Sequence, residues 1–214
     1  MIIKDVMTRN PICVEVDTSI VKAKEILNKN NFSKLPVVDK QKKLVGIITK
    51  NDISKVSPSD ATTLDKYEIS ALLDKLTCGK CMTKDVITIS ENQIIEEAAR
   101  IMVDSNIGCV PVVKDDLVIG IVTESDLFEM FTNMFCARLK GVRANFQMAD
   151  KPGSLALLFS KIAELGGNIV SVVTRESEIA GNRRVTIKVL DVELEPVNKI
   201  LEDCGATIID IRVA

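Results

Sequence analysis

The 214-residue sequence contains no histidine and no tryptophan, and aromatic residues make up only 3% of it. Histidine is the commonest general base and the commonest zinc ligand, and it activates the nucleophile in Ser-His and Cys-His pairs. We therefore expect a protein that is not an enzyme, holds no metal and requires no cofactor. Catalysis by carboxylates or lysine stays open. It is only a minor alternative, because no pair of acids recurs at a spacing that would mark a catalytic site.

The sequence also lacks an excess of positive charge, a long apolar run and a disulfide pattern. Its 28 Lys and Arg face 30 Asp and Glu, which gives a net charge of −2 and no basic surface for nucleic acid. No apolar run approaches the roughly 20 residues of a membrane span, and the start MIIKDVMTRN is unlike a secretion signal. The six scattered cysteines suit reduced thiols. We expect a cytoplasmic protein with neither a nucleic-acid nor a membrane partner.

An internal repeat dominates residues 1–133. VMTRNPICV (6–14) matches CMTKDVITI (81–89), and KLPVVDKQKKLVGIITKNDI (34–53) matches CVPVVKDDLVIGIVTESDL (109–127). Each copy predicts a short strand, a helix (residues 19–30 or 93–105), two strands and a closing helix. One copy has too little core to be stable alone, so we expect the two to pack together with pseudo-twofold symmetry.

The first helix of each copy is predicted to be amphipathic. Residues 17–19 supply capping side chains before the first of these helices. Helical spacing places four apolar residues of each helix on one face: Ile20, Ala23, Ile26 and Leu27 in the first copy, and Ile94, Ala98, Ile101 and Met102 in the second.

These repeats resemble the tandem cystathionine-β-synthase (CBS) domain pair, whose marks are an M-T segment, a P-V-V-D strand and a terminal G-hydrophobic-hydrophobic-T-x-x-D. The resemblance implies two clefts that bind an adenosine compound such as AMP, ATP, NAD or S-adenosylmethionine. The Asp of each T-x-x-D would bind the ribose hydroxyls and the Thr a phosphate. The implied cleft residues are Ile12, Lys34, Pro36, Thr49, Asp52, Ile87, Cys109, Pro111, Thr123 and Asp126.

A second interpretation of T-x-x-D stays open. The same spacing before an apolar helix is close to a capping box, in which both side chains only satisfy helix N–H groups. The two clefts also differ, because Ser33-Lys34 in the first copy becomes Gly108-Cys109 in the second. A lysine can bind a phosphate, so the first cleft is the better candidate for a charged nucleotide.

The cysteines in CGKC (78–81) have the C-x-x-C spacing of redox and zinc sites. No second pair accompanies them, and the second cysteine belongs to the repeated CMT phrase. Local packing is the simpler interpretation.

After residue 141 the pattern changes to strand, helix, strand, strand, helix, strand, which predicts a ferredoxin-like βαββαβ domain with both helices on one face of the sheet. The segment ADKPGSLALLFSKIAELGGNIVSV (149–172) resembles the ACT domain, which typically binds amino acids. The resemblance implies an amino-acid site at Asp150, Gly153 and Asn168. A plain turn and helix start, with the domain serving dimerisation alone, is the alternative.

The fold class predicted for the whole chain is therefore α+β, with two CBS repeats packed as one module and an ACT domain after them. The predicted boundaries are 1–57 and 81–133 for the repeats, 58–80 for a linker and helix, and 134–214 for the ACT-like domain. This order resembles acetoin-utilisation regulatory proteins of the AcuB type. It implies a sensor of an adenosine nucleotide, and open sheet edges predict a homodimer. A structural scaffold without any ligand is the alternative.

Overall fold

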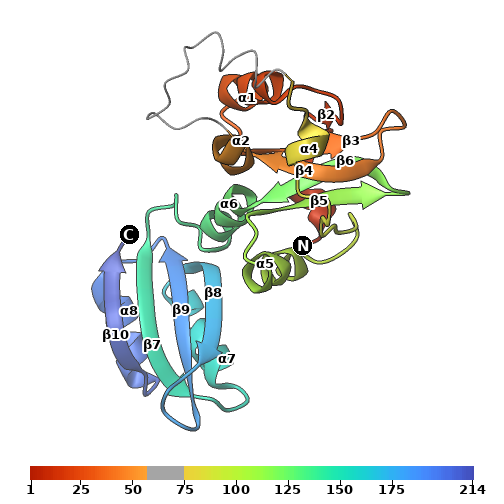
Figure 1. Cartoon of the computed structure of the whole chain (residues 1–214). Coiled ribbons are helices and arrows are strands. Elements are labelled where there is room, and N and C mark those ends of the chain that lie inside the picture. The colour runs from red at the N-terminus through yellow and green to blue at the C-terminus, as the bar shows by residue number, and fades with distance from the viewer. Residues whose placement is uncertain (57–74) are drawn as a thin grey trace. The chain divides into compact units, whose positions relative to one another are not determined.

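The computed structural model describes residues 1–56 and 75–214, which form two compact units, Met1–Leu127 and Phe128–Ala214 (Figure 1). The predicted α+β fold, two packed repeats followed by a four-stranded sheet with two helices, is confirmed. Most of the predicted linker helix, residues 58–74, lies outside the described residues. Within the described part of the chain, no helix has the length and apolar character needed to cross a membrane.

The first unit contains both repeats in similar element order. The first repeat comprises η1 (Ile3–Asp5), β1 (Thr8–Arg9), β2 (Val14–Glu15), α1 (Ile20–Lys29), β3 (Lys34–Val38), β4 (Leu44–Thr49) and α2 (Lys50–Val56). The second comprises α4 (Cys78–Cys81), α5 (Ile95–Asp104), β5 (Cys109–Lys114), β6 (Leu117–Thr123) and α6 (Glu124–Met134), the last of which continues into the second unit.

The caps and buried faces of α1 and α5 differ at one point from the sequence prediction. Ser19 caps α1 as predicted, since its hydroxyl accepts a hydrogen bond from the Lys22 N–H at 3.2 Å. The prediction that Ile94 lies on the buried face of α5 is wrong. The helix begins at Ile95, so Ile94 is its extended N-cap residue and is 55% exposed, while Ile95 takes the buried position.

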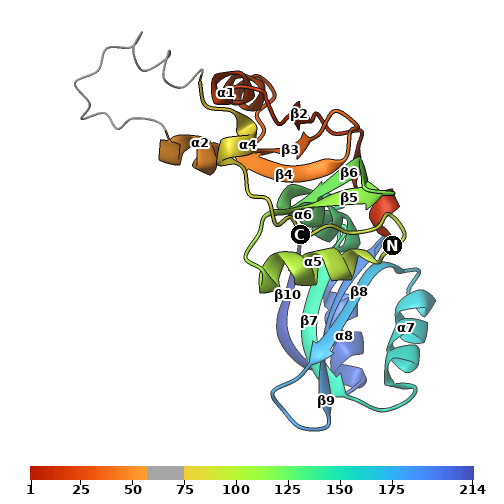
Figure 2. The ribbon, with the colours of Figure 1, turned by 45° about the vertical axis from the view of Figure 1, so that its right-hand side comes forward.

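The two repeats exchange the segments with which they begin. The stretch 6–14, predicted as one strand, divides around Pro11: β2 pairs with β3 of its own repeat, whereas β1 pairs with β6 of the other repeat. Thr83 makes the equivalent bridge to Ile47 of the first repeat. The resulting sheets have the orders β2-β3-β4 and β1-β6-β5 and lie against each other (Figure 2). This exchange explains why neither repeat is a complete unit.

The glycine that begins the repeated G-hydrophobic-hydrophobic-T-x-x-D motif makes room for that exchange. A Cβ on Gly46 would lie 2.3 Å from the Met82 sulfur, and one on Gly120 would lie 2.5 Å from the Met7 sulfur. Both methionines belong to the M-T segment of the opposite repeat. The glycine therefore occurs in both copies because each repeat must leave room for the first segment of the other.

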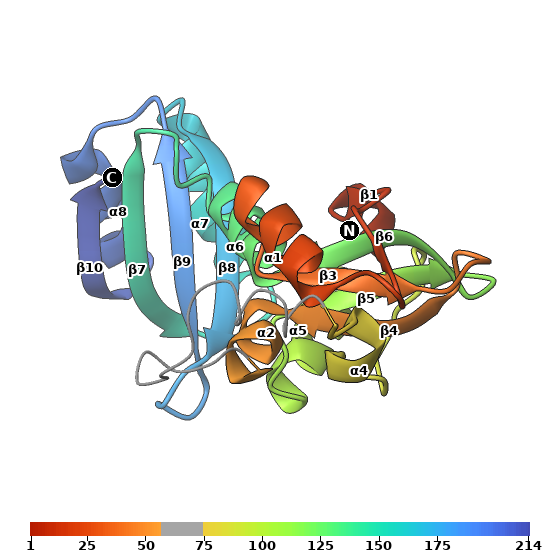
Figure 3. The same ribbon diagram turned by 45° about the horizontal axis from the view of Figure 1, so that its top comes forward.

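The second unit, beyond the end of α6, is an antiparallel sheet with the order β10-β7-β9-β8 (Figure 3). Val142, Ala144, Phe146 and Met148 alternate along β7 into the core under α7 and α8, so the residues between them lie on the opposite face. Its elements are β7 (Val142–Ala149), α7 (Ser154–Glu164), β8 (Asn168–Glu176), β9 (Asn182–Leu190), α8 (Leu194–Asp203) and β10 (Thr207–Val213).

Candidate functional site

The first T-x-x-D motif forms a complete capping box at the start of α2. Asp52 Oδ2 accepts hydrogen bonds from the Thr49 N–H at 3.0 Å and the Thr49 hydroxyl at 2.7 Å. The Asp52 N–H in turn donates to Thr49 Oγ1 at 3.1 Å. Lys55 Nζ lies 3.8 Å from the other carboxylate oxygen, and the Asp52 side chain is only 16% exposed. Both side chains therefore satisfy the helix end, as the capping interpretation predicts.

The second motif makes two of these three internal bonds and also reaches a cleft. Asp126 Oδ2 accepts from the Thr123 N–H and from the Thr123 hydroxyl, both at 2.7 Å. Thr123 also lines the cavity described next. Its hydroxyl oxygen keeps acceptor capacity after donating its proton, so capping and ligand contact are compatible at this residue.

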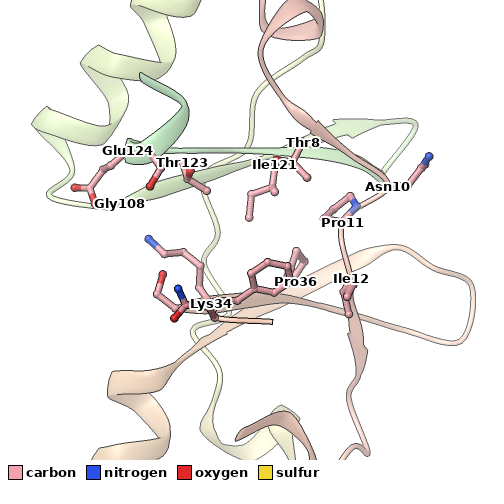
Figure 4. A pocket seen from close by; sticks show the side chains of 14 residues that line it. Thr8, Asn10, Pro11, Ile12, Lys34, Pro36, Gly108, Ile121, Thr123 and Glu124 are labelled. Carbon is pink, nitrogen blue, oxygen red and sulfur yellow. The ribbon is translucent and has the colours of Figure 1, made fainter. Parts of the chain in front are cut away.

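A cleft of about 380 Å³ lies between the two repeats (Figure 4). Residues 8, 10–12, 31–34 and 36 come from the first repeat, and residues 108, 121 and 123–125 come from the second. Ile12, Pro36 and Ile121 give it apolar walls, and Ile12 is 44% exposed. The volume lies within the range of small-molecule sites, which is about 300–1,000 Å³.

Four of the ten predicted cleft residues line this cavity: Ile12, Lys34, Pro36 and Thr123. The other six do not line it: Thr49, Asp52, Ile87, Cys109, Pro111 and Asp126. Each of these six has a repeat counterpart among the predicted residues: Thr49 corresponds to Thr123, Asp52 to Asp126, Ile87 to Ile12, Cys109 to Lys34 and Pro111 to Pro36. The cleft thus combines the first half of one repeat with the T-x-x-D of the other, because the repeats exchange their first segments.

Two opposite charges converge at one end of the cleft. A Cβ on Gly108 would lie 2.8 Å from Lys34 Nζ and 2.7 Å from Glu124 Oε2, so both charged groups lie close to the Gly108 backbone. In Figure 4 the Lys34 amine points toward Gly108 and Glu124. The sequence analysis missed Glu124. The available signal was the comparison of TKND with TESD, in which Lys50 stands opposite Glu124.

The C-x-x-C cysteines occupy the first and last positions of α4, and their thiols are not activated. Burial raises the pKa of Cys78 to about 11, and burial also raises the pKa of Cys81. A redox-active thiol has the opposite shift. Within residues 1–56 and 75–214, no group of three or more His, Cys, Asp or Glu side chains could hold a metal ion. The raised pKa values of both thiols favour local packing over a redox role.

We expect Cys78 and Cys109, whose pKa burial also raises to about 11, to alkylate slowly in the folded protein. At pH 8 each thiolate fraction should be about 100-fold below that of the unfolded chain, whose thiols have the ordinary pKa of 9.0. Pulsed iodoacetamide labelling, read by mass spectrometry with and without urea, measures this ratio. Equal labelling of Cys78 in both states would contradict the assignment.

The three residues predicted for an amino-acid ligand lie in the ACT unit. Arg183 hydrogen-bonds the Asp150 carboxylate at 2.9 Å and thereby lowers the pKa of Asp150. Gly153 has a positive φ of 88° and precedes α7 as its N-cap, and Asn168 is exposed at the start of β8. The structure thus gives Asp150 a partner within the chain, and the predicted amino-acid site stays a prediction.

Interlocked repeats around a shared cleft, followed by a four-stranded sheet with two helices, define a tandem α+β module joined to a ferredoxin-like domain. The chain belongs to the CBS domain family: residues 3–59 and 78–133 match the CBS domain, and residues 140–212 match the TTHA0829-like ACT domain. Both are regulatory domains. The AcuB-like resemblance is also supported by a solved structure.

Several relatives share the CBS region. The L-aspartate semialdehyde sulfurtransferase of Methanocaldococcus jannaschii is 37% identical over 131 residues, which are 61% of this chain and 23% of that protein. Protein MJ1426 of the same organism is 35% identical over 152 residues, covering 60% of this chain and 90% of that one. This chain spans about a quarter of the length of the sulfurtransferase and of a Methanosalsum zhilinae homoserine O-acetyltransferase.

Two solved structures are similar to the same region. The CBS domain pair of protein MJ0100, in complex with 5′-methylthioadenosine and S-adenosyl-L-methionine, is 37% identical, with a TM-score of 0.51. That match covers 61% of this chain and 95% of the other. A Vibrio cholerae protein named for acetoin utilization (AcuB) is 28% identical, with a TM-score of 0.54, over 64% of this chain and 95% of the other.

Proposed function

We propose that the chain is a non-enzymatic regulatory sensor whose inter-repeat cleft binds an adenosine-containing ligand. The observation that carries this proposal is the 380 Å³ cleft, which places Thr123 and Lys34 beside apolar walls. An adenine ring suits the walls formed by Ile12 and Pro36. The Thr123 hydroxyl and the start of α6 suit the hydroxyls or an anionic group of the ligand. The ligand-bound CBS pair of MJ0100 supports the same ligand class.

The charges at the end of the cleft favour one kind of adenosine compound. Lys34 attracts a carboxylate or phosphate, whereas Glu124 repels a polyphosphate and attracts an ammonium or sulfonium group. A ligand with a zwitterionic amino-acid tail, such as S-adenosylmethionine, satisfies both side chains. ATP satisfies only one of them.

We expect Glu124→Gln to weaken S-adenosylmethionine binding and to strengthen ATP binding, each by about tenfold, because it removes one charge–charge interaction of opposite sign for the two ligands. Lys34→Met should weaken both ligands. Binding of 5′-methylthioadenosine, which has no charged tail, should change little in either variant. Isothermal titration calorimetry measures all three affinities.

Lys50→Gln supplies the matched control, since Lys50 is the repeat counterpart of Glu124 and does not line this cleft. It should leave S-adenosylmethionine affinity unchanged at this site. If ATP affinity failed to rise in Glu124→Gln, the charge argument would be wrong. If no adenosine compound bound the wild-type chain, the scaffold alternative would replace the sensor.

We further propose that α6 carries the ligand signal toward the ACT unit. Glu124 and Ser125, its first residues, line the cleft. Just beyond its end, the Met134 carbonyl accepts a hydrogen bond from Ser171 Oγ at 2.8 Å, and Lys188 Nζ donates to the Cys136 carbonyl at 3.1 Å. A ligand that shifts the start of α6 therefore acts on an element whose other end is anchored to the ACT sheet.

The proposed assembly is a homodimer. Among the residues that the structure describes, the edge strands β8 and β10 each pair on one side only, and α6 carries exposed aromatic side chains. A second copy of the chain can cover both features. The proposed location is the cytoplasm. The six free cysteines support it, because thiols stay reduced in that compartment.

A further inference from the structure

A second, smaller cavity lies within the ACT unit, on the face of the sheet opposite α7 and α8. It has a volume of about 150 Å³ and is lined by Arg143, Ser171, Thr186, Ile187 and Lys188 from the sheet, by Phe135 and Ala137 from the segment after α6, and by Ala214 just after β10. Strand pairing brings the polar residues together, because Lys188 is registered opposite both Arg143 and Ser171. This volume corresponds to about five water molecules, so it suits only a small ligand.

Lys188 is the unusual member of this group. The residue is only 4% exposed, although lysine is almost never fully buried without a partner. Its ammonium has three donors, and the structure gives it one hydrogen bond, to the Cys136 carbonyl at 3.1 Å. Among the described residues, no carboxylate side chain pairs with it within 4.0 Å. A buried charge is costly unless it is paired, so the site favours an anion.

The other charged residue does not supply that anion. Arg143 lies 3.2 Å from Asp210, which also binds Arg212, and Asp210 does not line the cavity. The lining residues include two cations and no acidic side chain. The hydroxyls of Ser171 and Thr186 add polar groups beside Lys188, whereas Phe135 and Ala137 present apolar atoms. Ala214 adds main-chain atoms, and its oxygen accepts a hydrogen bond from the Gly141 N–H at 2.9 Å. The side chains of the lining thus combine an excess of positive charge with an apolar wall.

We propose that this cavity binds a small monocarboxylate. The carboxylate interacts with Lys188 and Arg143, and a short hydrocarbon group packs against Phe135 and Ala137. An amino acid of the same size carries an ammonium group for which the lining offers no acidic side chain, and inorganic phosphate has no apolar part for the wall. The site is distinct from Asp150, Gly153 and Asn168, none of which lines it.

The test titrates the full chain with sodium propionate at constant ionic strength and follows amide shifts of residues 186–188 by NMR. We expect saturable shifts with a Kd of about 1–10 mM, as for a ligand of five heavy atoms. Alanine differs from propionate by its ammonium group and should bind at least tenfold more weakly, as should phosphate. These comparisons need no variant. Equal binding of alanine or phosphate, or no saturable shift with propionate, would overturn the proposal.

Lys188→Met replaces the buried cation by an apolar side chain of similar length, which a core tolerates well. It should weaken propionate binding at least tenfold. Lys199→Met is the matched control, because Lys199 is exposed on α8, on the other side of the sheet. It should leave propionate binding unchanged. An equal loss in both variants, or no loss in Lys188→Met, would show that Lys188 only anchors the segment after α6.

Discussion

Gly46→Ala is expected to lower the free energy of unfolding of the CBS unit by about 2–3 kcal/mol, which is the upper range for overpacking a core. The new Cβ would lie 2.3 Å from the Met82 sulfur, 2.8 Å from its Cγ and 2.9 Å from the Thr83 carbonyl oxygen. Met82 can adjust its side chain, but the Thr83 backbone cannot move freely. It exchanges two hydrogen bonds of 2.9 Å with Ile47. Urea denaturation of the full chain measures the loss.

Gly120→Ala is the matched comparison, since it occupies the same position in the other repeat. Its Cβ would lie 2.5 Å from the Met7 sulfur but 3.3 Å from the Thr8 carbonyl, so a methionine rotation relieves most of the clash. We expect a loss of about 1 kcal/mol there. Adding Met82→Ala to Gly46→Ala should recover part of the stability, as a double-mutant cycle shows. Equal effects at both glycines would contradict the role assigned to the Thr83 backbone.

The repeat made much of this fold predictable. Apolar periodicity and the two T-x-x-D motifs predicted the strands, helices and pseudo-symmetry, and the βαββαβ order predicted the second domain. The exchange of first segments was not predictable in the same way. An alignment of the repeats equates Thr8 with Thr83 and Ile47 with Ile121, but it does not say which copy pairs with which. That choice depends on the packing of two whole repeats.

The site was less predictable for the same reason. Ile12, Lys34 and Pro36 of one repeat meet Thr123 of the other, so residues 87 to 111 positions apart share one cleft. Glu124 was overlooked because the repeated motif emphasises identical residues, whereas it differs from its counterpart Lys50. The prediction for Ile94 was wrong for a more local reason. Helix boundaries shift by a residue according to the cap, and a one-residue shift moves a side chain by about 100° around the helix.

The second large effect concerns assembly: we expect Phe131→Glu to raise the dissociation constant of the homodimer at least 30-fold, the size of an interface hot spot. Phe128, Phe131 and Met134 recur at intervals of three along α6 and are 69%, 57% and 52% exposed. Such a row of apolar side chains is typical of an interaction surface. Light scattering of the wild-type chain at micromolar concentration should give twice the chain mass of 23.5 kDa.

Asn133→Glu is the control for this prediction, because Asn133 is exposed on α6 about 200° around the helix from Phe131 and receives the same charge. It should leave the mass unchanged. The exposed edge of β10 is expected to contribute as well, so Ile209→Lys should weaken the dimer by a smaller factor. A dimer that resists Phe131→Glu but dissociates in Ile209→Lys would place the main contact at the sheet edge. A wild-type mass of 23.5 kDa at every concentration would refute the dimer itself.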